Sequence, residues 1–201
     1  MTRKRYIYSL KVWKGAFSSS RHSLPPTRKF KDQLRYKMQL EPLAAFFAQY
    51  PDFNYNPAAS ATKEFDRLSK FEGWGKSSRR KKNAKNAFKN GLVAQFNTSY
   101  GTDINDIANW HAIMTRLKIT PLPDTVSACK KVVKSLFVNL VDLVDAREDP
   151  SRLVKQFNSE MELSKYTKNE GKFFPRETAK AGGVLKFLLR RIHYPTNRQR
   201  G

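Results

Sequence analysis

The chain has 201 residues, with 39 Lys and Arg against 17 Asp and Glu, which gives a net charge of +22. Hydrophobic residues make up 39% of the sequence and aromatic residues 12%, a content that excludes a disordered basic tail. The single cysteine, Cys129, excludes an intramolecular disulfide. No apolar run approaches the ~20 residues that span a bilayer, so we expect no membrane partner.

The first predicted segment is a basic arm, partly extended, over residues 1–37. Its first 31 residues contain no Asp or Glu, and Arg3, Lys4 and Arg5 lie near its start. One interpretation is an arm that lies along nucleic acid. The other is an organelle-targeting presequence, which shares this Arg-rich, acid-poor composition. Two consecutive prolines interrupt the segment and it shows no clean amphipathic helix, which favours the arm.

Residues 38–192 predict an all-α fold, a single compact helical domain of about six to eight helices, followed by a basic tail over residues 193–201. Pro42 fits the first turn of the first helix, and Ser60 is the expected N-cap of the second. The third predicted helix, about residues 77–99, carries apolar residues at every fourth position. These are Ala84, Phe88, Leu92 and Phe96.

Two further helices are predicted to form a hairpin. Asp103 or Asn105 is expected to cap a helix over about residues 107–117, and Asp124 is expected to cap one over about residues 126–137. The turn between them holds two prolines and is longer than that of a DNA-reading helix-turn-helix. We therefore expect the hairpin to pack into the core.

The last third of the chain gives less regular signals. Residues 136–144 fit either a continuation of the preceding helix or a buried strand, and the sequence does not decide. Residues 145–149 are acidic and predict a surface turn. Short helices are predicted over residues 151–157 and 159–166. A last helix over about residues 177–192 completes the domain, with its leucines facing inward.

The positive charge is concentrated in three blocks, residues 1–40, 61–100 and 151–201. In the middle block, six cations crowd the first half of the predicted helix over residues 77–99. A helix N-terminus already carries partial positive charge, so cations there are unfavourable by themselves. They are favourable if phosphates dock at this end. Two other interpretations stay open, a nuclear localisation signal and a solvated helix start.

The sequence therefore predicts a set of nucleic-acid-binding cations drawn from all three blocks. They are Arg79, Arg80, Lys81, Lys82, Lys85, Lys89, Arg3, Lys4, Arg5, Lys186, Arg190 and Arg191.

No pattern of residues indicates catalysis. Cys129 has no Cys or His at metal-ligand spacing, and no phosphate-binding glycine loop is present. Asp103 and Asp106, like Asp142 and Asp145, are spaced to share a metal, but helix capping explains them more simply. We predict that the protein is not an enzyme and uses no cofactor or metal.

The leading functional prediction is non-catalytic binding of nucleic acid, through phosphates; DNA and RNA are not distinguished. The alternative is a protein-interaction or scaffold module within a ribonucleoprotein. Its contact surface would be the aromatic segment with Phe46, Phe47, Tyr50, Phe53 and Tyr55. The third prediction is a metal-dependent nuclease. We expect a nuclear or otherwise intracellular protein, with a mitochondrial location as the alternative.

Three segments carry a resemblance. AAFFAQYPDFNYNP, FNTSYGTDINDIANW and VNLVDLVDA resemble segments of a group of fungal proteins of uncharacterised function. The resemblance covers roughly residues 40–190. It implies a single helical domain and no activity.

Overall fold

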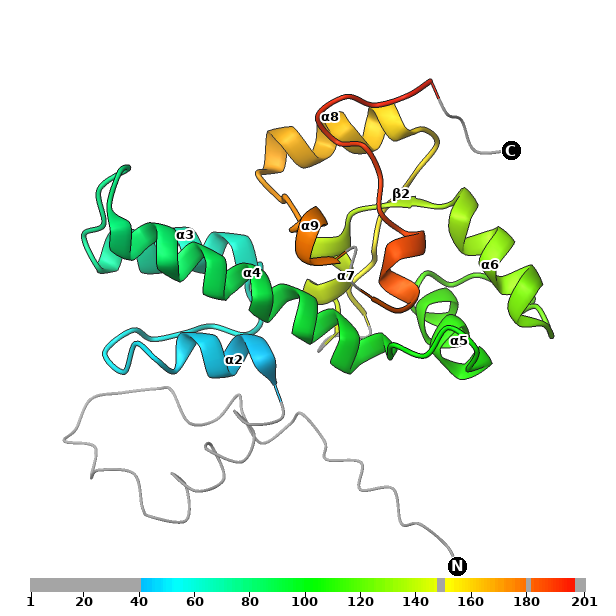
Figure 1. Ribbon diagram of the computed structural model, residues 1–201, viewed down its shortest axis with the longest axis horizontal. Helices are drawn as coiled ribbons and strands as arrows, with labels where there is room; N and C mark the ends of the chain where they lie inside the picture. The colour runs from blue at the N-terminus through cyan, green and yellow to red at the C-terminus, as the bar shows by residue number, and fades with distance from the viewer. Residues whose placement is uncertain (1–40, 148–150, 180–181, 198–201) are drawn as a thin grey trace, which may run out of the picture.

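The computed structural model describes residues 41–147, 151–179 and 182–197. Helices dominate these ranges, so the predicted all-α class is confirmed (Figure 1). The predicted arm, with Arg3, Lys4 and Arg5, lies outside the described residues, as does the end of the predicted tail.

The elements follow the chain in a simple order. They are α2 (Pro42–Phe47), α3 (Ala61–Phe71), α4 (Arg79–Tyr100), α5 (Ile107–Arg116), α6 (Val126–Ser135), β1 (Phe137–Val138), α7 (Leu140–Asp145), β2 (Gln156–Phe157), α8 (Glu160–Glu170), α9 (Arg176–Ala179) and the 3₁₀ helix η2 (Val184–Phe187).

The long helix α4 packs against α2, α5, α7, α9 and η2. Its predicted apolar stripe is confirmed, because Ala84, Phe88, Leu92 and Phe96 are all buried. Phe88 stacks on Phe65 of α3 with the ring centroids 4.7 Å apart. Helices α2, α3 and α4 thus share one aromatic core. The helix over 107–117 and the one that follows it form the predicted hairpin, α5 against α6.

Residues 136–144, which were predicted as either a helix or a strand, contain both. They form the two-residue strand β1 and then, after a break at Asn139, the helix α7. Every residue of α7 is buried. The hydroxyl of Tyr100, at the end of α4, donates to the carbonyl oxygen of Leu143 at 2.8 Å. Burial raises the pKa of Tyr100 to about 12, so this bond persists at neutral pH.

The predicted acidic surface turn over residues 145–149 is wrong at its start. Asp145 is buried, and its Oδ1 accepts the backbone N–H of Ala61 at 2.9 Å. It therefore caps the first turn of α3 from 84 residues away. Ser60 is the N-cap residue of α3, as predicted, but its side chain accepts no bond from the helix. Its hydroxyl faces the hydroxyl of Thr62 instead, at 3.3 Å.

Two other predicted caps are off by one to three residues. Asp106, not Asp103 or Asn105, caps α5 through the N–H of Ala108 at 2.9 Å. The carboxylate of Asp103 accepts the N–H of Asn105 and so shapes the preceding loop. At α6 the cap is Thr125, the residue after the predicted one.

The predicted helix over residues 151–157 is wrong. Residues 156 and 157 form β2, which pairs antiparallel with β1 so that Phe157 lies opposite Phe137. These two rings and Leu163 of α8 make a second, smaller hydrophobic cluster. A pairing with a distant strand outweighs the local pattern here. Helix α8 agrees with the predicted helix over 159–166 and extends beyond it.

The predicted last helix over residues 177–192 is also wrong, because the described chain there holds only α9 and η2 before it becomes irregular. Gly183 explains the break. Its backbone, at φ 60° and ψ −157°, occupies a region that is essentially restricted to glycine. A Cβ atom on Gly183 would lie 2.9 Å from the backbone of Thr102. Leu185 and Leu188 are nevertheless buried, as predicted.

We expect Gly183→Ala to lower the free energy of unfolding by about 2–4 kcal/mol, because it combines a disfavoured backbone with a close contact. Gly182→Ala is the matched control. A Cβ atom there meets nothing within 4 Å, so its effect should stay within about 0.5 kcal/mol. Urea denaturation measures both; equal losses would contradict this account of the break.

Candidate nucleic-acid interface

The first half of α4 presents cations on its outer side. Ser78 caps the helix by accepting the N–H of Lys81 at 3.4 Å. Arg79, Arg80, Lys82 and Lys85 are exposed. Lys81 and Lys89 are half-buried. Within residues 41–147, 151–179 and 182–197, none of the six side chains has a hydrogen bond or an ion pair.

The polar residues of this half-helix fall into two parallel rows. Lys82, Lys85 and Lys89 follow the i, i+3, i+7 spacing that places side chains along one line of a helix. Three exposed asparagines follow the same spacing on the neighbouring line; they are Asn83, Asn86 and Asn90. Ala84 and Phe88 point the other way, into the core. We call the two rows and Arg79 the α4 basic face.

No acidic residue lies near these cations in the sequence. The sequence from Gly73 to Thr102 contains no Asp or Glu, and Glu72 precedes it at the C-cap of α3. A run of like charges along an exposed surface produces a positive potential that attracts anions. The α4 basic face is therefore a concentrated cationic surface made of side chains that the sequence predicted.

The other predicted cations differ in what they contact. Lys186 is exposed, with its ammonium 5.2 Å above the ring of Phe187. The guanidinium of Arg190 donates to the carbonyl oxygens of Lys134 at 2.8 Å and Leu136 at 2.7 Å. Arg190 thus ties the C-terminal segment to the end of α6, and we leave it out of the interface.

Arg191 has an exposed side chain, but its backbone is fixed. Its N–H donates to Glu160 at 2.6 Å, and Glu160 also accepts the N–H of Thr196 at 2.7 Å. Burial acts to raise the pKa of Glu160, but the hydrogen bonds from Thr196 and Arg191 outweigh it and hold the pKa below its ordinary value of 4.5. The ionised carboxylate therefore anchors the C-terminal segment to α8.

The aromatic segment lies in the core. Phe46, Phe47 and Phe53 are buried, while Tyr50 and Tyr55 are half-buried. The rings of Phe47 and Tyr55 stack with centroids 4.1 Å apart. Three of the five rings are therefore unavailable to a partner in this fold.

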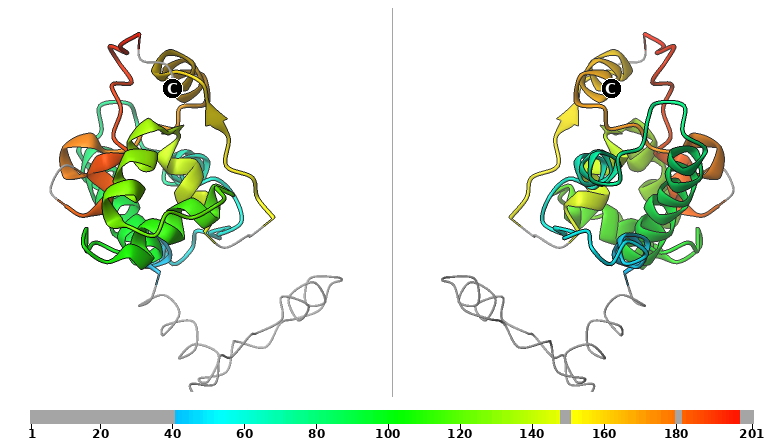
Figure 2. Two further views of the ribbon diagram at one scale, coloured as in Figure 1. Left: turned by 90° about the vertical axis from the view of Figure 1, so that its right-hand side faces the viewer. Right: turned by 90° about the vertical axis from the view of Figure 1, so that its left-hand side faces the viewer.

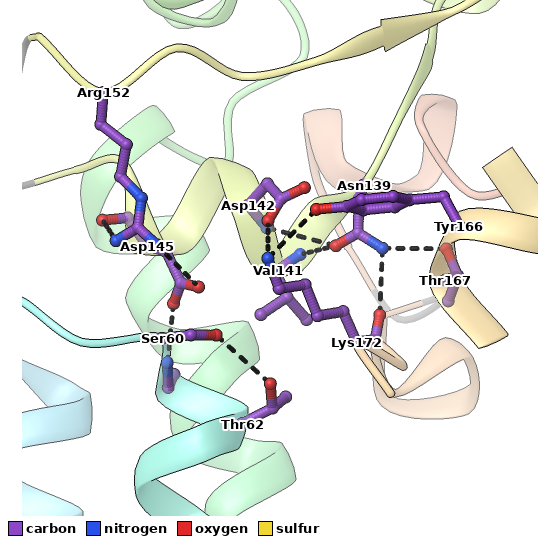
Figure 3. Close-up of polar contacts among 11 residues, drawn as sticks. Ser60, Thr62, Asn139, Val141, Asp142, Asp145, Arg152, Tyr166, Thr167 and Lys172 are labelled. Carbon is purple, nitrogen blue, oxygen red and sulfur yellow. Dashed lines mark hydrogen bonds and ion pairs between the residues drawn. The ribbon is translucent and has the colours of Figure 1, made fainter. Parts of the chain in front are cut away.

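A buried polar cluster was missed by the sequence reasoning (Figure 3). Asn139 caps α7 by accepting the N–H of Val141 at 2.9 Å, and its amide donates to the hydroxyl of Thr167 at 2.9 Å. Lys172 donates to Asp142 at 2.6 Å and to the hydroxyl of Tyr166 at 3.1 Å. The signal for this cluster was present in VNLVDLVDA, where polar residues interrupt an apolar run every third position.

The ionisation of this cluster follows from its pairing. Burial acts to lower the pKa of Lys172, but the hydrogen bonds to Asp142 and Tyr166 more than compensate and raise it above 10.5. Burial also raises the pKa of Tyr166. The lysine is therefore a cation neutralised by Asp142, and the pair stabilises the fold. Burial raises the pKa of Asp145 as well.

The residues considered as metal ligands are dispersed. Among the residues that the structure describes, no group of three or more His, Cys, Asp or Glu could hold a metal ion. Cys129 is buried, and burial raises the pKa of its thiol. His111 bonds the carbonyl oxygen of Pro123 at 2.8 Å. Over the same ranges no helix is long and apolar enough to cross a membrane.

Comparison with known proteins gives no match: no family of proteins, no curated protein and no solved structure is similar to this chain at a significant level.

We expect Asn139→Ala to lower the free energy of unfolding by about 2–4 kcal/mol, because it removes a helix cap and leaves buried groups without partners. Asn86→Ala makes the same substitution at an exposed position of α4 and should change stability by less than about 0.5 kcal/mol. Thermal and urea unfolding of the two variants compare them directly. Similar stabilities would contradict the assigned role of Asn139.

The bonds of Glu160 predict a pH dependence. A lowered carboxyl pKa stabilises the folded state above 4.5, the pKa of the unfolded chain, and this stabilisation is lost as pH falls through the lowered value. Glu160→Gln should cost about 1–2 kcal/mol at pH 7. The difference from the wild type should shrink as pH falls below 4.5. A difference that does not vary between pH 3 and pH 7 would show that the charge contributes nothing.

Proposed function

We propose that this protein binds nucleic acid without catalysis, through phosphates that contact the α4 basic face. The observation that carries the proposal is the row of exposed and half-buried cations on a helix that lies in a stretch of sequence, from Gly73 to Thr102, without Asp or Glu. Cations that are crowded and unpaired repel one another. A polyanion relieves this repulsion, and each phosphate contact also releases a condensed counterion.

The dimensions of the α4 basic face suit a phosphate backbone. Lys82 and Lys89 are separated by seven residues, about 10 Å along a helix that rises 1.5 Å per residue. One strand of duplex DNA rises about 3.4 Å per phosphate along the duplex axis. The row of three lysines is therefore long enough to meet more than one phosphate of a strand.

The row of asparagines adds a second kind of contact. Asn83, Asn86 and Asn90 are exposed beside the lysines, and their amides both donate and accept hydrogen bonds. Such groups contact sugars, phosphates and base edges in protein–nucleic acid complexes. Their presence favours nucleic acid over a simple anion such as inorganic phosphate.

Two alternatives are weaker on the described geometry. The scaffold alternative relies on the aromatic segment, whose rings Phe46, Phe47 and Phe53 are buried. The nuclease alternative relies on paired carboxylates, but Asp142 pairs with Lys172 and Asp145 caps α3. Both groups already serve the fold.

We expect the triple variant Lys82→Ala, Lys85→Ala, Lys89→Ala to weaken binding to a single-stranded oligonucleotide. Each phosphate contact contributes about 0.7 to the slope of log affinity against log salt for single strands. Loss of three contacts should therefore reduce the slope by about 2. Fluorescence anisotropy titrations between 50 and 200 mM salt measure this slope.

The control is Lys118→Ala, Lys131→Ala, Lys165→Ala, which removes the same charge from exposed positions outside α4. We expect it to change the slope by less than about 1. Equal effects of the two triple variants would mean that binding depends on net charge alone, and the assignment to the α4 basic face would be rejected.

A further inference from the structure

A cleft of about 710 Å³ lies between α8 and the chain that follows η2. Figure 2 shows these two segments together at one end of the molecule, beyond the bundle of α2 to α7. The cleft has apolar walls from Leu140, Leu163 and Phe174. Its volume falls within the roughly 300–1,000 Å³ of small-ligand sites.

Exposed aromatic rings lie at the rim of the cleft, outside the hydrophobic core. Phe173 is 42% exposed and Tyr194 is 85% exposed. The rings of Phe173 and His193 stack with centroids 5.5 Å apart and planes inclined by 9°. All three residues line the cleft. A stacked pair of exposed rings offers a flat surface on which an unpaired base can continue the stack.

The cleft is also positively charged. Among the residues that the structure describes, its lining contains no Asp or Glu but includes Arg176 and Arg191. The side chains of these two arginines make no hydrogen bond or ion pair within the described parts of the chain. The other two cations of the lining are already engaged, Lys172 with Asp142 and Arg190 with backbone carbonyls. Two arginines are therefore free to bind a phosphate.

Glu160, which lies beside the two arginines, does not cancel this charge. Glu160 lines the adjoining pocket together with Arg176 and Arg191. Its two carboxylate oxygens accept bonds from the backbone N–H of Arg191 and from Thr196. Glu160 therefore holds the rim segment in place, and the two guanidinium groups remain available.

We propose that this cleft binds one unpaired nucleotide of a single strand, with its base stacked on Phe173 and His193 and its phosphate held by Arg176 and Arg191. A paired base is already stacked within its duplex and cannot enter. The inference rests on the proposed binding of nucleic acid and adds a preference for single strands. Arg176 begins α9, and α9 contacts α4, so the cleft adjoins the helix that carries the α4 basic face (Figure 1).

The test compares a fluorescent single-stranded 12-mer with a 12-bp duplex of the same sequence, using the full chain. Phe173→Ala should weaken binding of the single strand about tenfold, the usual size of a base–aromatic stack. Binding of the duplex should change less than about twofold. Phe71→Ala, at a position 55% exposed on α3, is the matched control and should affect neither probe.

The outcomes separate this inference from the proposed function. If Phe173→Ala leaves the affinity for the single strand unchanged while the α4 triple variant weakens binding, the nucleotide site in the cleft is rejected and the proposed function is supported. If Phe173→Ala weakens binding of the single strand and of the duplex equally, the nucleotide site is also rejected. Loss in Phe173→Ala without loss in the α4 triple variant supports the cleft and rejects the α4 basic face.

A second measurement distinguishes a nucleotide from a free anion. AMP should shift the NMR signals of Phe173 and His193 in the full chain. Inorganic phosphate at the same concentration should shift only signals around Arg176 and Arg191. If phosphate and AMP shift the signals of the two rings equally, the cleft is an anion site without base stacking.

Discussion

The fold depends on burying α7, a six-residue helix that carries two carboxylates and begins at an asparagine. Buried polar groups are costly unless each finds a partner. The partners come from distant segments: Lys172 for Asp142, Ala61 for Asp145 and Thr167 for Asn139. One short helix therefore ties the start of α3 and the end of α8 to the centre of the molecule.

This arrangement fixes how α4 is oriented. Its inner side packs on α2 and α7, and Tyr100 bonds the backbone of α7. The cations of its first half can then only face outward, because the inner positions are occupied by Ala84, Phe88 and Leu92. The charge opposes the helix dipole and gains no partner from the described chain. An anionic ligand removes both penalties together, which is the physical basis of the proposed function.

The sequence predicted the parts of this structure that depend on local pattern. Helices α2 to α6 follow apolar periodicity, and the α4 basic face belongs to one helix, so spacing alone located it. The failures depend on distant contacts. Asp145 looked like a surface acid because its partner is 84 residues away. Gly183, which has a backbone conformation restricted to glycine and lies against the backbone of Thr102, interrupts a predicted helix. The cleft joins residues 138–140, 163–176 and 188–194, which no local pattern connects.

An NMR titration of the ¹⁵N-labelled full chain with a single-stranded oligonucleotide tests binding at the α4 basic face most directly. We expect the largest shifts on the backbone and side-chain amides of residues 79–90, with Asn83, Asn86 and Asn90 among them. They should fade as salt rises, because phosphate contacts are salt-dependent. Shifts confined to α6 and α8, or shifts that persist unchanged in high salt, would contradict binding of phosphates at the α4 basic face.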